Sequence, residues 1–244
     1  MCGYKGTSAI LTVVVGLILV QAAAAQPVID DFSVPDPVGA VVINLLDPDP
    51  TLIETADVLL AAVGGERDIL LDVLGVSGPV SFSGSIGGGT FLFNSGAIGV
   101  AVILQYDGLD SDTVGPPASL VNSEGLGVVD LTSIGGAFFL DFLSIEGGPV
   151  QTTGIEIEVH GGGGSAQFGG QIPDSATPST FLAPFGGFSN AGVLQSATSI
   201  ELRINPGGAS NVDFELDAVG VPEPATVCLL GLGSLALLWR RQRD

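Results

Sequence analysis

Histidine, lysine and cysteine, which carry much of enzyme chemistry, are almost absent from the central part of this 244-residue chain. His160 is the only histidine, so a Ser-His-Asp mechanism or a zinc site would rest on it alone. A triad needs a base beside a nucleophile, and zinc usually takes several His or Cys ligands. Lys5 is the last lysine, and Cys2 and Cys228 lie near the chain ends. Cysteine-nucleophile and Schiff-base chemistry are therefore excluded from the central part, and we expect His160 at the solvent-exposed end of a strand.

Carboxylates are the abundant reactive groups, and a glycoside hydrolase needs only two of them. The chain has 26 acidic residues, so accidental pairs are common and their abundance gives no specificity. We expect Asp141 with Glu146, and Glu156 with Glu158, to be solvated strand faces. Enzymes that cleave glycans tend to hold sugars on aromatic platforms, yet the central part has no Trp and only Tyr106. The twelve Phe are expected mainly in the core, which weakens both the hydrolase and the sugar-binding hypotheses.

The stretch YDGLDSD holds the strongest local cluster of oxygen donors. Asp107, Asp110 and Asp112 share a turn after an expected strand. Ca²⁺ takes six to eight oxygen ligands, so this turn is a candidate calcium site, although it lacks EF-hand spacing. The competing interpretation is an acidic surface turn. Asp30 and Asp31 form a second, weaker candidate, and no other cofactor is indicated.

Alternation of apolar and polar residues predicts the elements that would position these groups. Ile155, Ile157 and Val159 are expected on a buried face, and the polar residues between them on a wet one. The same pattern runs through 200–205 and 212–217. The expected strands are Val28–Val34, Val38–Leu46, Arg67–Leu74, Val80–Gly84, Gly89–Phe93, Ala97–Tyr106, Leu126–Leu131, Ala137–Ile145, Gly154–His160, Ser199–Ile204 and Asn211–Val219. Short strands separated by turn residues predict an all-β, two-sheet sandwich of jelly-roll type.

The segment TLIETADVLLAAVGG fits two interpretations. Its apolar residues from Leu52 to Val63 have helical spacing, and Gly64 would end a short helix. The alternative, which we favour, is an extended segment that leads into the strand beginning at Arg67.

The first 26 residues have the layout of a secretory signal. Lys5 supplies the basic region, the run from Ala9 to Val20 supplies the apolar region, and an alanine-rich exit follows. Small residues at Ala23 and Ala25 predict cleavage by signal peptidase before Gln26. An uncleaved anchor is disfavoured because the apolar run is shorter than the roughly 20 residues of a spanning helix.

Removal of this signal would leave residues 26–222 without cysteine, because Cys228 lies in the C-terminal apolar run. An exported domain without disulfides must be held by its core. Arg67 and Arg203 are the only basic residues of 26–222, which hold all but two of the chain's 26 acidic residues, so the formal net charge of this region is −22. Such a charge excludes nucleic acid as a sensible partner, disfavours anionic membrane surfaces and favours cations, calcium among them.

The chain ends VPEPATVCLLGLGSLALLWRRQRD. Residues Val227 to Trp239 carry no charge and would form a helix of about 20 Å, shorter than the ~30 Å hydrocarbon core of a bilayer. The arginines Arg240, Arg241 and Arg243 would hold the terminus on the cytoplasmic side. The prolines of the Pro-Glu-Pro tripeptide favour an extended segment that a membrane protease can bind.

This order of Pro-Glu-Pro, short apolar helix and terminal arginines resembles the PEP-CTERM sorting signal of bacterial exported proteins. In that family an exosortase, a membrane cysteine transpeptidase or protease, cuts near the tripeptide. The resemblance implies that Pro222, Glu223 and Pro224 are recognised, that 227–239 is a transient anchor and that the terminal arginines are the membrane stop. It implies an origin in a Gram-negative-type bacterium and a final place at the cell surface or outside the cell. It implies no activity, since the bodies of such proteins are diverse.

The body also resembles, more loosely, the galactose-binding-like jelly rolls of carbohydrate-binding modules. The stretches that carry this resemblance are VIDDFSV, GGERDILLDV, AVILQYDGLDSD, PFGGFSNAGVLQSATSIELRI and VDFELDAV. In such domains the first and last strands often pair, which would place 28–34 beside 211–219.

These patterns predict a signal peptide at 1–25, a β-sandwich at 26–220, and a sorting signal with a short transmembrane helix at 221–244. The leading hypothesis is a non-enzymatic surface or extracellular-matrix protein, with calcium or matrix polysaccharide as candidate partners and the membrane contacted only through the C-terminal helix. The alternatives are a carbohydrate-binding module and, third, a carboxylate-dependent glycan hydrolase.

Overall fold

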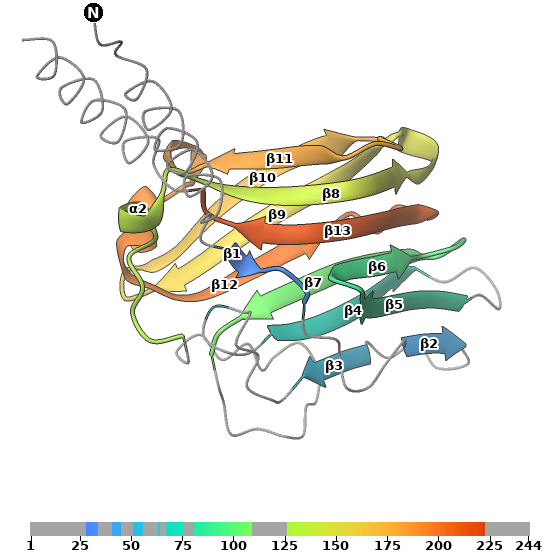
Figure 1. Ribbon diagram of the computed structural model, residues 1–244, viewed down its shortest axis with the longest axis horizontal. Helices are drawn as coiled ribbons and strands as arrows, with labels where there is room; N and C mark the ends of the chain where they lie inside the picture. Colours follow the sequence, from blue (N-terminus) through green and yellow to red (C-terminus); the bar gives the residue numbers. More distant parts are fainter. Residues whose placement is uncertain are drawn as a thin grey trace, which may run out of the picture.

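The computed structural model describes residues 28–33, 41–44, 51–55, 63, 67–75, 81–108 and 126–222, and it forms a two-sheet, jelly-roll-like β-sandwich (Figure 1). Sheet A has seven strands in the order β11 (Ser179–Pro184), β8 (Ala137–Gly147), β13 (Val212–Gly220), β6 (Thr90–Asn94), β5 (Ser81–Gly87) and β2 (Val41–Asn44), with β1 (Val28–Asp30) beside β13. Sheet B has six, in the order β10 (Gly164–Pro173), β9 (Thr152–Gly161), β12 (Ala197–Ile204), β7 (Gly99–Tyr106), β4 (Arg67–Gly75) and β3 (Thr51–Thr55). Every pairing between these strands is antiparallel, so the all-β sandwich expected from the sequence is confirmed.

The core lies between the two sheets and is rich in phenylalanine. Eleven of the twelve Phe side chains are buried, and Phe168 is partly buried against them. Phe214 of β13 is a centre of this packing, with its ring centroid 5.7 Å from that of Phe91, 5.2 Å from Phe93 and 5.9 Å from Phe142. These rings come from three neighbouring strands of sheet A, so burial of Phe214 joins β6, β13 and β8.

Ten of the eleven expected strands are present, with ends that differ by a few residues. The exception is the stretch Leu126–Leu131, where the expectation of a strand was wrong. Asp130 caps a helical turn instead, α2 (Leu131–Ile134), by accepting hydrogen bonds from the amides of Thr132 and Ser133 at 3.0 and 3.2 Å. Within Leu126–Leu131, Val129 alone forms a β-bridge, an isolated one with Ala197.

Strand β10 was not expected, because Gly170 interrupts the alternation of Ala166, Phe168 and Ile172 in its sequence GSAQFGGQIP. It nevertheless pairs with β9 over its whole length, from Gly164 to Pro173. β11 was missed as well. Three short 3-10 helices complete the described secondary structure: η2 (Gly148–Val150), η3 (Phe185–Gly187) and η4 (Ala191–Ser196).

The ambiguous segment near residue 52 begins as the extended strand β3, which supports the interpretation that we favoured. Strand β1 pairs with β13, with Val28 opposite Gly220, so the first and last strands of the domain lie side by side as expected.

Candidate functional site

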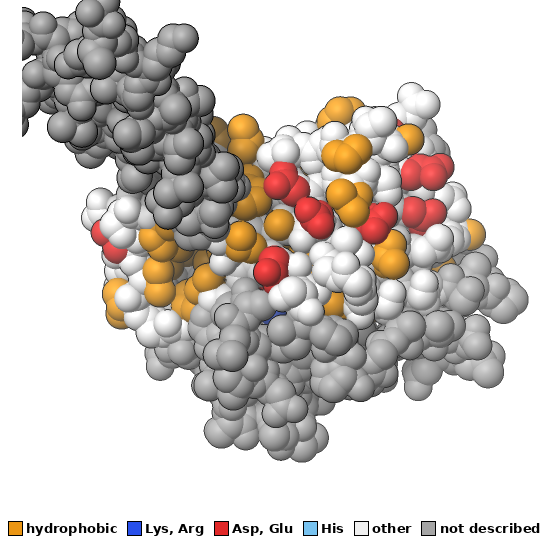
Figure 2. All heavy atoms as spheres, viewed as in Figure 1, with side chains coloured by type: hydrophobic (Ala, Val, Ile, Leu, Met, Phe, Trp, Pro, Cys, Tyr) orange, Lys and Arg blue, Asp and Glu red, His pale blue; other side chains and the backbone are white. Residues whose placement is uncertain are grey.

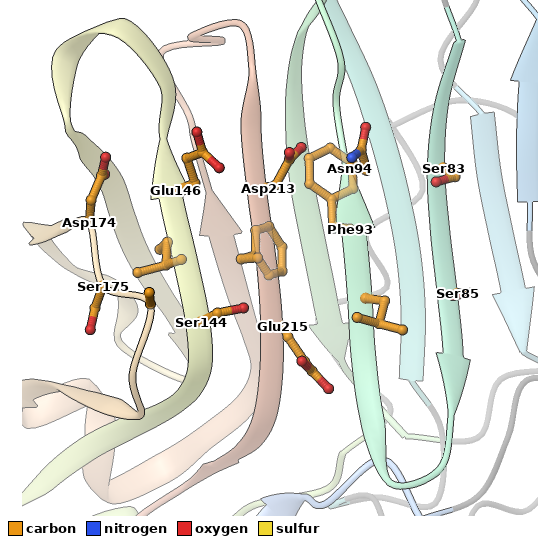
Figure 3. Close-up of a pocket in the computed structure, with 14 residues that line it drawn as sticks. Ser83, Ser85, Phe93, Asn94, Ser144, Glu146, Asp174, Ser175, Asp213 and Glu215 are labelled. Atoms are coloured by element: carbon orange, nitrogen blue, oxygen red, sulfur yellow. The ribbon is translucent and has the colours of Figure 1, made fainter.

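Two rows of mainly polar side chains cross the outer face of sheet A (Figure 3). In the first row Glu146 of β8, Asp213 of β13, Asn94 of β6 and Ser83 of β5 are successive cross-strand partners. In the second row the partners are Ser144, Glu215, Leu92 and Ser85. We call the surface formed by these eight residues the acidic groove.

Strand alternation places these side chains outward. Phe214 and Leu216 are buried on β13, which leaves Asp213, Glu215 and Asp217 on the opposite face. On β8 the register slips between Phe142 and Ser144, so Leu143 is an extra residue, or β-bulge.

The acidic groove has a volume of about 690 Å³ and is extended at the β8 end by Asp174, Ser175 and Ala176. The residues that line it among those described offer four carboxylates, hydroxyls and one amide, and none of them is Lys, Arg or His. Phe93 and Phe214 contribute to its lining, but both side chains are at least 97% buried and serve the core. Space-filling Figure 2 shows this face of the molecule, with acidic side chains spread over β8 and β13.

Two of the carboxylates are fixed by backbone amides. Asp174 accepts a hydrogen bond from the Gly147 amide at 2.6 Å, and Asp213 accepts one from the Ser95 amide at 3.2 Å. These bonds hold one oxygen of each carboxylate and limit rotation of the side chain. Two of the four carboxylates in the groove are therefore acceptors held in fixed positions.

Asp217 continues the acidic face toward β1. Partial burial raises the pKa of its carboxyl group, and the like charges of Asp141, Glu215 and Asp31 raise it further, in that order. Asp141 itself accepts a hydrogen bond from the Thr180 hydroxyl at 2.5 Å. The face is therefore one on which negative charges repel one another.

A set of hydrogen-bond acceptors with hydroxyl donors can bind the hydroxyl groups of a sugar or a cation. Aromatic platforms are absent from the groove residues that the structure describes and that point outward.

The pairs Asp141 with Glu146 and Glu156 with Glu158 lie on outer sheet faces, as expected. Glu146 and Glu156 are exposed, and their partners half-buried.

His160 lies at the end of β9 with its side chain 28% exposed, as expected. Its nearest acidic neighbour is Glu158, with Nε2 3.8 Å from Oε1. Next to them on the outer face of sheet B, Glu201 is buried and accepts a hydrogen bond from Arg203 Nε. We expected Glu201 on a wet face, and that expectation was wrong, because the Glu201 side chain is only 3% exposed.

The expectation for Asn205 was wrong for the same reason, burial of a polar side chain. Asn205 was expected on the wet face, but its side chain is buried and Nδ2 donates to the carbonyl oxygens of Val100 and Ala209, each at 2.8 Å. Its φ of 60° lies in the left-handed region, which Asn adopts more readily than most residues. Asn205 thus closes the turn between β12 and β13.

A buried ion pair joins the two sheets. Nη1 of Arg67 on β4 lies 2.5 Å from Oδ2 of Asp30 on β1, and both side chains are 1% exposed. The Phe32 amide donates to Asp30 Oδ1 at 2.8 Å, and the Arg67 guanidinium carbon lies 5.1 Å from the Phe32 ring centroid. Burial raises the pKa of Asp30, whereas Arg67 and the hydrogen bonds lower it by less.

Tyr106 completes this cluster. It is the only Tyr of the central part, and its fully buried side chain cannot serve as an aromatic platform for a sugar. Its hydroxyl donates to Asp30 Oδ2 at 3.3 Å. Burial, together with the Asp30 carboxylate, raises the pKa of Tyr106 well above its usual value, so Tyr106 acts as a neutral donor.

The calcium hypothesis stays a prediction. Asp107 is buried and accepts a hydrogen bond from Gln105 Nε2 at 2.9 Å, whereas Asp110 and Asp112 lie outside the described residues. Asp31 is exposed, and hydrogen bonds from the Ser33 side chain and from the Ser33 amide, the latter at 3.0 Å, lower its pKa. Within the described ranges, no three His, Cys, Asp or Glu side chains lie where they could share a metal ion.

The residues of the two targeting signals fall largely outside the described part of the chain. Pro222 is described and half-buried. The other residues of the two signals lie outside the described residues: Ala23, Ala25, Gln26, Glu223, Pro224, Arg240, Arg241 and Arg243. None of the helices in the described ranges is long and apolar enough to span a membrane.

The PEP-CTERM protein-sorting motif matches this chain over residues 220–242. The resemblance seen in the sequence is thereby confirmed, and it marks an exported protein that an exosortase sorts and that is transiently anchored in the membrane of a Gram-negative-type bacterium. No curated protein matches the chain.

Several solved carbohydrate-binding modules are similar in architecture. The Family 11 module of cellulosomal cellulase Lic26A-Cel5E of Clostridium thermocellum has 10% identity and a TM-score of 0.36, covering 82% of this chain and 96% of that one. The Family 29 module CBM29-2 has 15% identity and a TM-score of 0.35, with 72% and 89% covered. A Family 29 module from Piromyces equi has 12% identity and a TM-score of 0.33, with 77% and 93% covered. At these TM-scores the likeness is too loose to transfer a binding property.

Proposed function

We propose that this chain is a non-enzymatic protein of the bacterial surface or extracellular matrix. Its signal peptide is removed after Ala25, its C-terminal apolar segment holds it briefly in the membrane, and an exosortase processes it at Pro222 to Pro224. The β-sandwich is then delivered as a structural or adhesive component. The observation that carries this proposal is the sorting motif over residues 220–242.

The chemistry of the body supports a non-enzymatic role. The only histidine has an acidic neighbour, Glu158, with Nε2 3.8 Å from Oε1. Ser165 and Ser199 are its cross-strand partners, but among the described residues neither hydroxyl forms a hydrogen bond with the imidazole, as an activated nucleophile would. The carboxylates of the acidic groove lie on an open sheet face, and two of them are fixed by backbone amides. Such a surface suits contact with a matrix better than acid–base catalysis, which needs two carboxyl groups with separated pKa values.

The intact mass of the protein recovered from the surface and the medium of its host tests the proposal. A mass that begins at Gln26 and ends near Pro222 to Pro224 supports both cuts, and any excess mass identifies an attached group. The variant Glu223→Ala should accumulate in membranes with its tail, whereas Glu156→Ala, on the outer face of sheet B, should be processed normally. A wild-type chain found only in membranes, with its terminal arginines intact, would contradict the proposal.

The second candidate is a carbohydrate-binding module, and the acidic groove is the observation that favours it. Carboxylate, amide and hydroxyl groups in two rows can accept and donate hydrogen bonds to sugar hydroxyls. Affinity electrophoresis in gels that contain the host's own exopolysaccharide would measure this binding. Retardation that is lost in Asp213→Ala and kept in Glu156→Ala would support the groove, and equal retardation of both variants would contradict it. Release of reducing sugar from that polymer by the wild type, lost in Glu146→Gln, would instead support the hydrolase.

A further inference from the structure

The sorting motif begins inside the folded domain. Its match starts at residue 220, and Gly220 is the last residue of β13. At that point β13 is paired on both sides, because Gly220 lies opposite Phe139 of β8 and opposite Val28 of β1. The first residue of the motif is therefore the last residue of β13, and Figure 1 shows this strand within sheet A.

The next two residues are also held by the domain. Val221 is 1% exposed and belongs to the hydrophobic core. The Pro222 carbonyl oxygen is so close to Gly135 that a Cβ built on Gly135 would stand 2.1 Å from it and 2.6 Å from Val221 Cγ1. Gly135, which follows α2, therefore provides the close backbone approach that seats Val221 and Pro222.

We propose that the fold itself sets the first bond at which the tail can be cut, and that this bond lies C-terminal to Pro222. This inference rests on the proposed exosortase processing and specifies its position. A protease binds several extended residues around the bond that it cuts, so cleavage of folded proteins requires exposed or locally opened chain. The Gly220–Val221 and Val221–Pro222 bonds are protected because Gly220 lies in the sheet, Val221 in the core and Pro222 against Gly135.

The reaction breaks one peptide bond at or beyond the carboxyl side of Pro222. The carbonyl carbon of the broken peptide bond forms a new bond to the oxygen of water or to the nucleophile of an acceptor molecule. The proton released by the water or the acceptor goes to the leaving amine of the tail. The processed body thus keeps Val221 and Pro222 and loses none of its core.

Gly135 acts here as a positioning residue, and its neighbour Gly136 offers a matched control. A Cβ on Gly135 would overlap the Pro222 carbonyl, whereas a Cβ on Gly136 would meet nothing within 4 Å. Gly135→Ala should therefore displace Val221 and Pro222 and expose the protected bonds, and Gly136→Ala should not.

Two measurements test this inference on the full chain. In the host, C-terminal peptide mapping of the processed wild type should find ends at Pro222 or later, and Gly135→Ala should add ends before Pro222 that Gly136→Ala lacks. In vitro, brief digestion with proteinase K should leave the wild-type body ending at or after Pro222, with cleavage before Pro222 about tenfold faster in Gly135→Ala.

The outcomes separate this inference from the proposed function. A chain that keeps its tail in the host contradicts exosortase processing, while the proteinase K ends still decide whether the fold protects residues 220–222. Wild-type ends before Pro222 in a body that keeps its native circular dichroism would overturn the inference. Equal cleavage of the wild type and Gly135→Ala, with both folded, would overturn the role of Gly135.

Discussion

Asp30 and Arg67 form a buried ion pair across the two sheets, with Oδ2 of Asp30 2.5 Å from Nη1 of Arg67. Asp30 ends β1, the short first strand that adds to sheet A beside β13, and Arg67 begins β4 of sheet B. Because β1 has only three residues, its ladder bonds alone would hold it weakly. The ion pair, the Phe32 amide and the Tyr106 hydroxyl together fix it in place.

The first prediction concerns this pair. Asp30→Ala should lower the free energy of unfolding by about 3–5 kcal/mol, because it removes a buried carboxylate that contacts the buried Arg67 guanidinium. Urea denaturation followed by circular dichroism measures the change. Asp31→Ala is the control, since Asp31 is exposed and forms local hydrogen bonds with the neighbouring Ser33, and it should lower stability far less. Equal effects of the two variants would show that the pair does not stabilise the fold.

A second prediction follows from Asp213 and Glu146, which face each other directly across β13 and β8. Like charges in directly opposed positions destabilise a sheet, whereas favourable cross-strand pairs contribute roughly 0.2–1 kcal/mol. Asp213→Asn should therefore raise stability by a few tenths of a kcal/mol in low salt and by less in 1 M salt. Asn keeps the oxygen that accepts the Ser95 amide, so the loop contact is preserved.

Glu156→Gln provides the comparison for that measurement. Glu156 lies directly opposite Arg203 on sheet B, so loss of its charge should not stabilise the chain. Thermal unfolding of both variants at two salt concentrations distinguishes repulsion between Asp213 and Glu146 from a general effect of the large negative charge. A gain in stability for both variants would contradict a local cause.

The third prediction is a pH dependence. The folded-state pKa of Asp217 is raised above its ordinary value of 3.8 by burial and by neighbouring carboxylates. A group with a raised folded pKa binds its proton more tightly in the folded state, so its contribution to stability is present below 3.8 and is lost as the pH rises through its folded pKa. In Asp217→Asn the free energy of unfolding should therefore fall less than in the wild type as the pH rises above 3.8. An unchanged profile in chemical denaturation at a series of pH values would contradict the prediction.

Much of the fold could be predicted from the sequence because alternation is a local property. Ile155, Ile157 and Val159 are buried as their spacing predicts. β10 was missed for a physical reason: Gly170 interrupts the alternating apolar residues Ala166, Phe168 and Ile172, so the pattern is short, although β10 pairs with β9 along its whole length. The helical turn α2 depends on capping by Asp130, which we had placed within an expected strand at Leu126–Leu131.

The acidic groove could be predicted only in part. Alternation on β13 places Asp213 and Glu215 outward, but no local pattern shows that β13 lies between β8 and β6. The bulge at Leu143 likewise depends on pairing between strands that are distant in sequence. Alternation places Tyr106 on the same face as Val102 and Leu104, but only the tertiary structure shows that its hydroxyl contacts the buried Asp30 carboxylate.

The last prediction concerns Phe214, whose ring contacts Phe91, Phe93 and Phe142 in the core of sheet A. Phe214→Ala should lower the free energy of unfolding by about 3–5 kcal/mol, because it removes buried ring surface and leaves a cavity among rigid neighbours. Leu92→Ala is the matched control, since Leu92 lies on the opposite face of sheet A and is 45% exposed, so its loss should cost much less. Denaturant midpoints of the two variants, compared at equal m-values, measure the difference. Similar midpoints would mean that the ring cluster around Phe214 does not hold β13 between β8 and β6.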